Sequence, residues 1–230
     1  RSFANAISAV GGGDAGLDAQ CGEISALYLS GAFDEASMKA NDAVQSFGPA
    51  PTLLYLRGIS VAAVGGSAAD VVRDLKASAQ ATPLDAASAL SALAFWYDVL
   101  EEASLAAESL TQALELQPSH LYSRYLEARW AVRDGAEGIA RDQFRELVGE
   151  APNCSAFLME LGNLLQLDGR HLPAEVAFRQ AETHRPVGVS STANASAWAE
   201  LALRRGLNLL AAEEFDASMD SLAAAQSLWP

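Results

Sequence analysis

Apolar residues recur along this chain at spacings of three and four, which place them on one face of an α-helix. The pattern is clearest between residues 155 and 186, where two such stripes are separated by Gly169. The members of these stripes are Leu158, Leu161, Leu165, Ala174, Phe178 and Ala181. The segment therefore predicts two helices that are joined by a tight turn at the glycine.

Prolines divide the rest of the chain into units of the same kind. Six of the eight prolines follow one another at intervals of 34, 35, 34, 34 and 44 residues, and they are Pro49, Pro83, Pro118, Pro152, Pro186 and Pro230. Each follows an apolar run, where a proline ends a helix without removing a needed N–H group. Because a period near 34 residues is typical of helix–turn–helix repeats, we predict six helix pairs. These are expected over residues 17–49, 52–83, 87–118, 121–152, 155–186 and 197–230.

Two segments fall outside this period. Residues 187–196 are rich in serine, valine and alanine, and we expect them to form a loop or a helix extension. Residues 1–16 are expected to form a partial N-terminal cap, with a helix over residues 3–10, followed by a glycine-rich joint. An end repeat has no neighbour on one side, so such a cap would shield the apolar edge of the first pair.

The units resemble tetratricopeptide repeats. In the clearest unit the matching residues are Leu158, Leu161, Gly162, Leu165, Gly169, Ala174, Phe178, Ala181 and Pro186. The six units cover nearly the whole chain, so the resemblance implies an all-α, right-handed superhelical solenoid of antiparallel helix pairs. It also implies a concave groove, lined mainly by the first helix of each pair, that holds an extended peptide or a partner helix.

The charge balance narrows the range of partners. The chain carries 15 basic and 29 acidic residues, which gives a formal charge of −14. Sequence-independent binding to nucleic acid or to anionic lipid needs a basic face, so we expect neither partner and no direct membrane insertion. Cys21 and Cys154 lie far apart and form no C-x-x-C pattern, which fits a reducing compartment. The localisation stays open, with a cytoplasmic location favoured.

Three glycines near the N-terminus match a nucleotide-binding pattern. Gly11, Gly13 and Gly16 have the G-x-G-x-x-G spacing that lets a backbone approach a pyrophosphate. The dinucleotide fold, however, requires strands around the motif, whereas every other segment here has helical periodicity. We therefore interpret the glycines as a joint and predict no cofactor.

The sequence offers no arrangement of residues that is suited to catalysis. The three histidines, His120, His171 and His184, fall by register in turns or at a helix end. No H-x-x-x-H or H-E-x-x-H pattern brings two of them together, and no nucleophile lies beside a base at a recognisable spacing. We predict no metal site, no catalytic residue and no enzymatic activity.

The candidate partner-binding residues lie on the first helices, at positions expected to face the groove. They are Tyr122, Tyr125, Arg129, Arg133, Phe95, Asp98, Met159, Asn163 and Gln166, with Tyr28, Ser60, Leu203 and Leu207 expected to face inward as well. The first four share one helix face and would suit an acidic segment, through stacking and forked hydrogen bonds. In the alternative, Tyr122 joins Leu126 and Trp130 in the core while the arginines pair with local acids.

One branch of the family binds the C-terminal carboxylate of heat-shock chaperones through lysine, asparagine and arginine. Cys21 and Ser25 stand where the first lysine and asparagine would be, so this activity is not expected here. The sequence instead favours a non-catalytic scaffold or adaptor that binds a protein or peptide. The alternative is a regulatory or substrate-recruiting module of a larger protein, such as an enzyme or a secretion-machinery component. The final helix, over residues 216–228, should expose an apolar stripe of Leu222, Ala225 and Leu228 that invites self-association or docking of further sequence.

Overall fold

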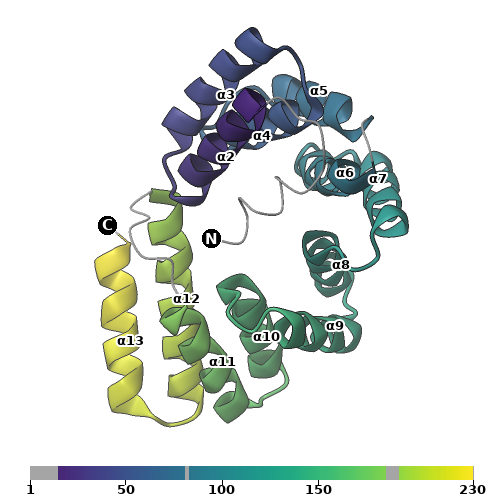
Figure 1. Cartoon of the computed structure of the whole chain (residues 1–230). Coiled ribbons are helices and arrows are strands. Elements are labelled where there is room, and N and C mark those ends of the chain that lie inside the picture. The colour runs from purple at the N-terminus through teal and green to yellow at the C-terminus, as the bar shows by residue number, and fades with distance from the viewer. Residues whose placement is uncertain (1–14, 81–82, 185–191, 230) are drawn as a thin grey trace. The chain divides into compact units, whose positions relative to one another are not determined.

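The computed structural model describes residues 15–80, 83–184 and 192–229 (Figure 1). These residues form twelve α-helices and no strand. The helices are α2 Ala15–Leu29, α3 Phe33–Phe47, α4 Pro51–Ala63, α5 Ala68–Ala79, α6 Pro83–Val99, α7 Ala103–Leu116, α8 Leu121–Arg133, α9 Glu137–Glu150, α10 Ser155–Leu167, α11 His171–Thr183, α12 Thr192–Ala211 and α13 Phe215–Leu228. The expected cap helix over residues 3–10 lies outside the described residues, as do Gly11 and Gly13.

The chain divides into two compact units, residues 1–123 and 124–230, and the boundary falls inside α8. In the first unit each helix from α2 to α7 packs against the next, and the first helices α2, α4 and α6 are neighbours. In the second unit α9 to α13 pack in the same consecutive manner, and α12 lies beside α13 along its length. The assignment of all repeats to one solenoid domain stays a prediction, as does the right-handed superhelical course.

Each helix pair closes around a contact between a small and a large side chain, which explains the glycine inside α10. A Cβ atom on Gly162 would lie 2.6 Å from Cε1 of Phe178, so only glycine fits against that buried ring. The equivalent glycine of the last pair, Gly206, similarly faces Leu222. In the first pair the sizes are exchanged, because Ile24 is large and the equivalent second-helix residue, Ala40, is small. Both are fully buried in one cluster, so this pair also combines one large and one small side chain where its two helices meet.

The turn inside each pair begins with a residue in the left-handed region of φ, seven positions after the first-helix position of this contact. Four of these turn residues are glycines, Gly31, Gly65, Gly135 and Gly169, with φ between 71° and 82°. The other two are Glu101, with φ of 62°, and Glu213, with φ of 63°. A side chain is unfavourable in this conformation, so the two glutamates show how strongly the repeat register fixes the turn.

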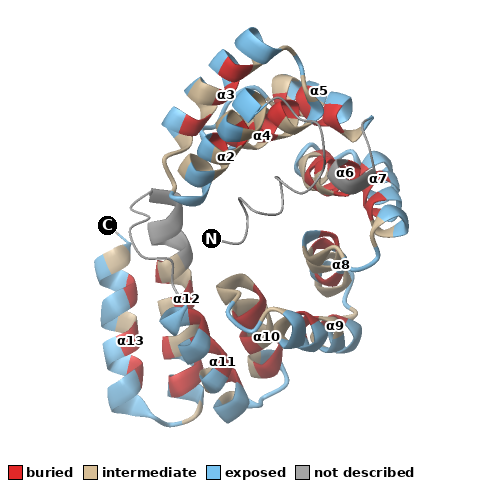
Figure 2. Ribbon diagram, in the orientation of Figure 1, coloured by how far each residue is buried: buried red, intermediate tan, exposed pale blue. Residues whose placement is uncertain are grey.

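Figure 2 places the buried residues on the faces where consecutive helices meet. On α13 they are Ser218, Ser221 and Ala225, and Ser218 donates a hydrogen bond to the carbonyl of Gly206 on α12 at 2.9 Å. The expected exposed stripe of Leu222, Ala225 and Leu228 is therefore wrong in its residues, because Ala225 is buried and the two leucines are half-buried. The helix α12 begins at Thr192, so residues 192–196 of the expected insertion form a helix extension.

Polar contacts join helices both within a pair and between neighbouring pairs. In the first unit Arg57 of α4 makes two hydrogen bonds, at 2.6 and 2.7 Å, to the buried carboxylate of Asp74 on α5. In the second unit the buried Asn208 of α12 donates to the carbonyl of His171 at 2.9 Å. Since that amide nitrogen is the donor, its oxygen accepts from Nδ1 of His171 at 3.0 Å. A buried side chain of this kind fixes the position of α12 against α11.

Candidate functional site

An aromatic pocket lies on the first helices of the first unit. It has a volume of about 410 Å³ and is open to solvent. Its lining residues come from α2, α4, α6 and the start of α8, and they are Tyr28, Tyr55, Ile59, Ala62, Ala63, Ala92, Phe95, Trp96 and Tyr122. None of these nine residues is charged. An apolar, concave surface with a few polar groups is the usual form of a binding site, so we call this set the aromatic pocket.

The polar groups of the aromatic pocket include two tyrosine hydroxyls. Burial, together with the neighbouring Tyr28, raises the pKa of Tyr55 to about 12. Burial also raises the pKa of Tyr28, whose ring packs edge-on against Phe33 with 5.2 Å between centroids. Both phenols therefore remain protonated near neutral pH, where each can donate a hydrogen bond.

Three of these residues, Tyr28, Phe95 and Tyr122, are expected from the sequence to face the groove, and all three line the pocket. Tyr122 is 40% exposed, so the alternative that buries it with Leu126 and Trp130 is wrong. Another candidate of this unit, Asp98, is half-buried and lies outside the lining.

The expectation for Ser60 is also wrong, because its side chain is completely buried. The second repeat begins one residue earlier than expected, at residue 51, where α4 begins. Ile59 therefore takes the groove-facing position, and it lines the pocket with Tyr55. The spacing of Tyr55, Ile59 and Ala62, at i, i+4 and i+7, could have indicated this face.

A second group of candidates, which we call the arginine face, consists of Tyr125, Arg129, Arg133, Met159, Asn163 and Gln166 on α8 and α10. The ring of Tyr125 packs against Phe144 and Phe157, with centroids 6.0 and 5.6 Å apart. Burial is the main cause of the raised pKa of Tyr125. The guanidinium of Arg129 lies over this ring, 5.8 Å from its centre, and makes a cation–π contact with it.

Acidic side chains of the chain itself lie within ion-pair distance of the two arginines. Arg129 approaches Glu160 of α10 at 3.7 Å, and Glu160 also accepts a hydrogen bond from Asn163 at 3.3 Å. Arg133 lies over Trp130, 5.4 Å from the ring centre, and approaches Asp134 at 3.4 Å. Both arginines keep about half of their side-chain surface exposed, at 48% and 53%. An incoming carboxylate would have to share these guanidiniums with acids of the chain.

His120 belongs to a polar cluster between α6 and α8 in the first unit. Its Nδ1 accepts a hydrogen bond from the backbone N–H of Ser123 at 3.3 Å, which places the ring proton on Nε2. That nitrogen faces Oγ of Ser88 at 3.3 Å, and Ser91 joins Ser123 at 2.6 Å. Burial lowers the pKa of His120. The neutral ring caps α8 and links it to α6, as expected for a structural histidine.

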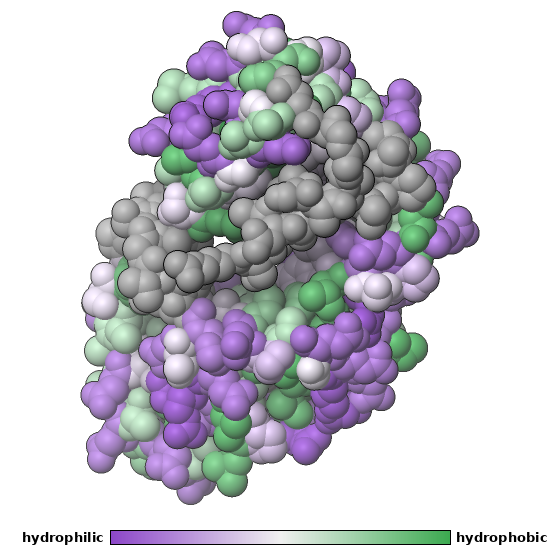
Figure 3. Space-filling view, viewed as in Figure 1, coloured by the Kyte–Doolittle hydropathy of each residue, from purple (hydrophilic) through white to green (hydrophobic). Residues whose placement is uncertain are grey.

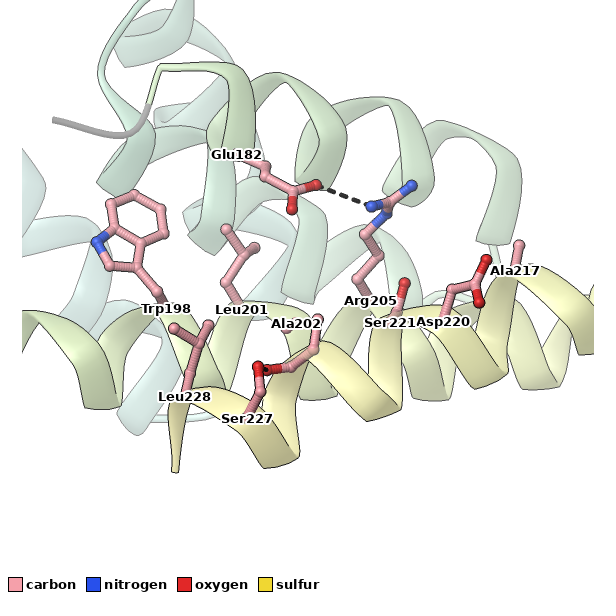
Figure 4. Close-up of a pocket in the computed structure, with 11 residues that line it drawn as sticks. Glu182, Trp198, Leu201, Ala202, Arg205, Ala217, Asp220, Ser221, Ser227 and Leu228 are labelled. Carbon is pink, nitrogen blue, oxygen red and sulfur yellow. Dashed lines mark hydrogen bonds and ion pairs between the residues drawn. The ribbon is translucent and has the colours of Figure 1, made fainter. Parts of the chain in front are cut away.

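A second cavity, of about 480 Å³, lies among α11, α12 and α13 (Figure 4). Trp198, Leu201 and Ser221 are among its lining residues. Arg205 lies in its wall and binds Glu182 at 2.8 Å, the contact that Figure 4 marks, and also Glu175 at 2.8 Å. Because both acids come from α11, this arginine serves to join α12 to the preceding pair.

The described residues include no group of three or more His, Cys, Asp or Glu that could hold a metal ion. None of the described helices combines the length and the apolar character required to cross a membrane. On the face drawn in Figure 3, hydrophilic side chains predominate over the helices of both units.

Comparison with solved structures identifies the fold. The chain superposes on the APC/C hetero-tetramer Cut9-Hcn1 with a TM-score of 0.73 at 18% identity, covering 90% of this chain and 38% of that one. It matches a tetratricopeptide repeat protein from Parabacteroides merdae ATCC 43184 with a TM-score of 0.61 at 18% identity, over 98% and 84% of the two chains. The chain has the tetratricopeptide-repeat fold. The prediction of an all-α helical-repeat solenoid is thereby confirmed.

A third tetratricopeptide-repeat structure of comparable likeness is pilF of Pseudomonas aeruginosa. Its TM-score is 0.64 at 12% identity, over 93% of this chain and 92% of that chain. Against Cut9-Hcn1 the chain spans 38% of the known structure. No protein-family model and no curated protein matches the sequence.

Proposed function

We propose that this chain is a non-catalytic protein-interaction module that binds an extended segment of a partner protein along its first helices. Tetratricopeptide-repeat neighbours support an interaction role in general. The observation that carries the specific proposal is the aromatic pocket, whose volume of about 410 Å³ suits one or two large apolar side chains.

The chemistry of the aromatic pocket fits a peptide rather than a charged metabolite. Its walls are aromatic and aliphatic, so an apolar anchor residue of the partner would be buried there. The protonated hydroxyls of Tyr28 and Tyr55 can donate hydrogen bonds to backbone carbonyls on either side of that anchor. Aromatic residues of this kind supply large contact area at a low cost in conformational entropy.

The arginine face is the proposed site for an acidic segment of a partner. Arg129 and Arg133 are half-exposed, and the rings of Tyr125 and Trp130 hold them in place. A carboxylate that replaces Glu160 or Asp134 as the partner of these arginines would gain forked hydrogen bonds.

The aromatic pocket can be tested by selecting binding peptides from a random 12-residue library displayed on phage. The change Phe95→Ala or Tyr122→Ala should weaken the selected peptides by about tenfold or more, because a buried aromatic anchor contributes several kcal/mol. Val99→Ala serves as the matched control, since Val99 lies on α6, is 54% exposed and does not line the pocket. If every selected peptide binds both pocket variants within about threefold of the wild type, the pocket is not the binding site.

The arginine face has a separate test. The double change Arg129→Glu with Arg133→Glu should abolish binding of acidic peptides from the same library, because it replaces attraction with repulsion. Arg145→Glu is the control, since Arg145 is 42% exposed on α9 and pairs with Asp142. Unchanged binding of acidic peptides to the double variant would remove this face from the proposal.

A further inference from the structure

The last helix carries an exposed apolar stripe, which we call the α13 face. Its large members on the helix are Phe215, Met219 and Leu222, spaced by four and three residues along one side, and Trp229 follows directly after the helix ends. Phe215 is 61% exposed, Met219 68% and Trp229 56%, whereas Leu222 is half-buried against Gly206. A contiguous stripe of this size is unusual on a free surface and marks an interaction site.

The preceding repeat indicates which kind of element fits this stripe. The register advances by 44 residues from α11 to α13, so Phe215, Met219 and Leu222 correspond to His171, Glu175 and Phe178. On α11 these positions are covered by α12, the first helix of the following pair: His171 bonds to Asn208, Glu175 to Arg205, and Phe178 shares a buried cluster with Leu201. A helix is therefore the element that this surface accepts in this fold.

The covering helix α12 makes these contacts with a regular set of residues. They are Trp198, Leu201, Arg205 and Asn208, spaced by three, four and three. Two of the four are polar because they meet polar partners on α11. On the α13 face those partners are replaced by Met219 and Phe215, so a helix that covers it needs apolar residues at the corresponding positions.

Charge further restricts the occupant. The helix α13 and the turn before it carry four exposed acids, Glu213, Glu214, Asp216 and Asp220, and α13 has no lysine or arginine. The flanks of the covering helix should therefore be basic.

We infer that the α13 face binds an amphipathic helix of a partner protein, with apolar residues at i, i+3, i+7 and i+10 and basic flanks. The partner helix occupies the position, relative to α12 and α13, that α12 occupies relative to α10 and α11. This surface is distinct from the aromatic pocket and the arginine face, and neither proposal depends on the other.

The probe is a synthetic peptide with the sequence of α12, residues 192–211, carrying Arg205→Leu, Asn208→Leu and Glu200→Lys. The control peptide has the unaltered sequence, whose arginine and asparagine would meet Met219 and Phe215. Titration of the full chain, followed by calorimetry, should give binding of the altered peptide at least about tenfold tighter than that of the control peptide. The fluorescence of Trp229, isolated by comparison with Trp229→Phe, should shift to shorter wavelength as the helix covers it.

Two variants of the chain make the test specific. Met219→Glu should weaken the altered peptide by about tenfold or more, because it places a charge in the centre of the stripe. Ile139→Glu, at a position on α9 that is 63% exposed, should leave binding within about twofold. Circular dichroism checks that both variants fold, and Met219→Gln provides a milder replacement if Met219→Glu does not.

Three results would overturn the proposal. They are equal affinity of the two peptides, no binding of the altered peptide, and binding that Met219→Glu leaves unchanged. Sedimentation of the chain alone tests a different occupant, a second copy. A dimer that Met219→Glu dissociates, together with a peptide that fails to bind, would assign the face to self-association instead.

Discussion

The two units share one repeat register but differ in charge and in how their helices are joined. Residues 1–123 carry five basic and 14 acidic side chains, whereas residues 124–230 carry ten and 15. In the second unit arginines link neighbouring helices, as Arg124 does with Glu146 and Glu150, and Arg141 with Asp168. In the first unit an arginine also joins two helices, Arg57 of α4 to Asp74 of α5, but α6 and α8 are linked by uncharged serines and His120.

This difference shows that the fold depends on the size of side chains at a few buried positions, and much less on the chemistry of the joins. Both units place a small residue of the first helix against a second-helix residue, and both place a left-handed residue at the turn. The polar joins can therefore vary between repeats, which leaves the first unit free to present an uncharged, aromatic surface.

The largest expected effect comes from filling the small positions. Gly162→Ala should destabilise the fold by about 1–3 kcal/mol, because the new Cβ would lie 2.6–2.7 Å from the buried ring of Phe178. The matched change in the first unit, Gly58→Ala, should be nearly neutral, since the nearest atoms belong to the Leu75 side chain at 3.2 Å and alanine favours the helix. Chemical denaturation measures both.

A compensating change sharpens this test. Phe178→Leu in the Gly162→Ala background should recover part of the lost stability, giving a non-additive double-mutant cycle. Additive effects would mean that the two side chains do not compete for the same space.

The stability that the His120–serine cluster gives to the contact between α6 and α8 should depend on pH. Folding lowers the pKa of His120 from 6.5, so the folded state binds this proton less readily than the unfolded chain does. The stabilisation is complete above pH of about 6.5 and is lost as the pH falls toward the lower pKa of the folded state. His120→Gln should cost about 1 kcal/mol at neutral pH, through lost hydrogen bonds, and should flatten the pH dependence of stability below pH of about 6.5. If His120→Gln leaves the pH dependence of the free energy of unfolding unchanged, a group other than His120 causes the loss of stability in acid.

The turn glutamates provide one matched position in each unit. Glu101→Gly and Glu213→Gly should each stabilise the chain by about 0.5–1 kcal/mol, because glycine adopts their positive φ without strain. The melting temperature should rise in both variants. A fall in either would show that the glutamate makes a compensating interaction in its turn.

The smallest effect concerns salt. Raising NaCl from about 0.05 M to about 1 M should increase hydrogen-exchange protection in α3 and α7 of the acidic first unit, where acidic side chains outnumber basic ones and repel one another. Protection in α9 and α11 of the second unit should fall slightly, because exposed ion pairs contribute under about 1 kcal/mol each. Equal changes in the two units would contradict an electrostatic difference between them.

The sequence was sufficient to predict the fold because proline and the small–large positions recur at a fixed period. The site was harder to predict. Tyr28, Phe95 and Tyr122 were found from the groove register, but Tyr55 and Trp96 resemble ordinary packing residues in the sequence. Ser60 was misplaced because the second repeat has one extra residue between Gly58 and Leu75, which moves every groove position of α4 by one. A shift of one residue rotates a position by about 100° around the helix, which here replaces a groove-facing position by a buried one.

The exchanged sizes of Ile24 and Ala40 limit how the repeats could be recombined. A chimera that joins the first helix of the first pair to the second helix of the fifth would press Ile24 against the position of Phe178, and two large side chains would compete for one space. The reciprocal chimera would set Gly162 against Ala40 and leave a void. The two helices of a pair are thus inherited as a matched set, so duplication of a whole pair preserves the fold while exchange of single helices does not.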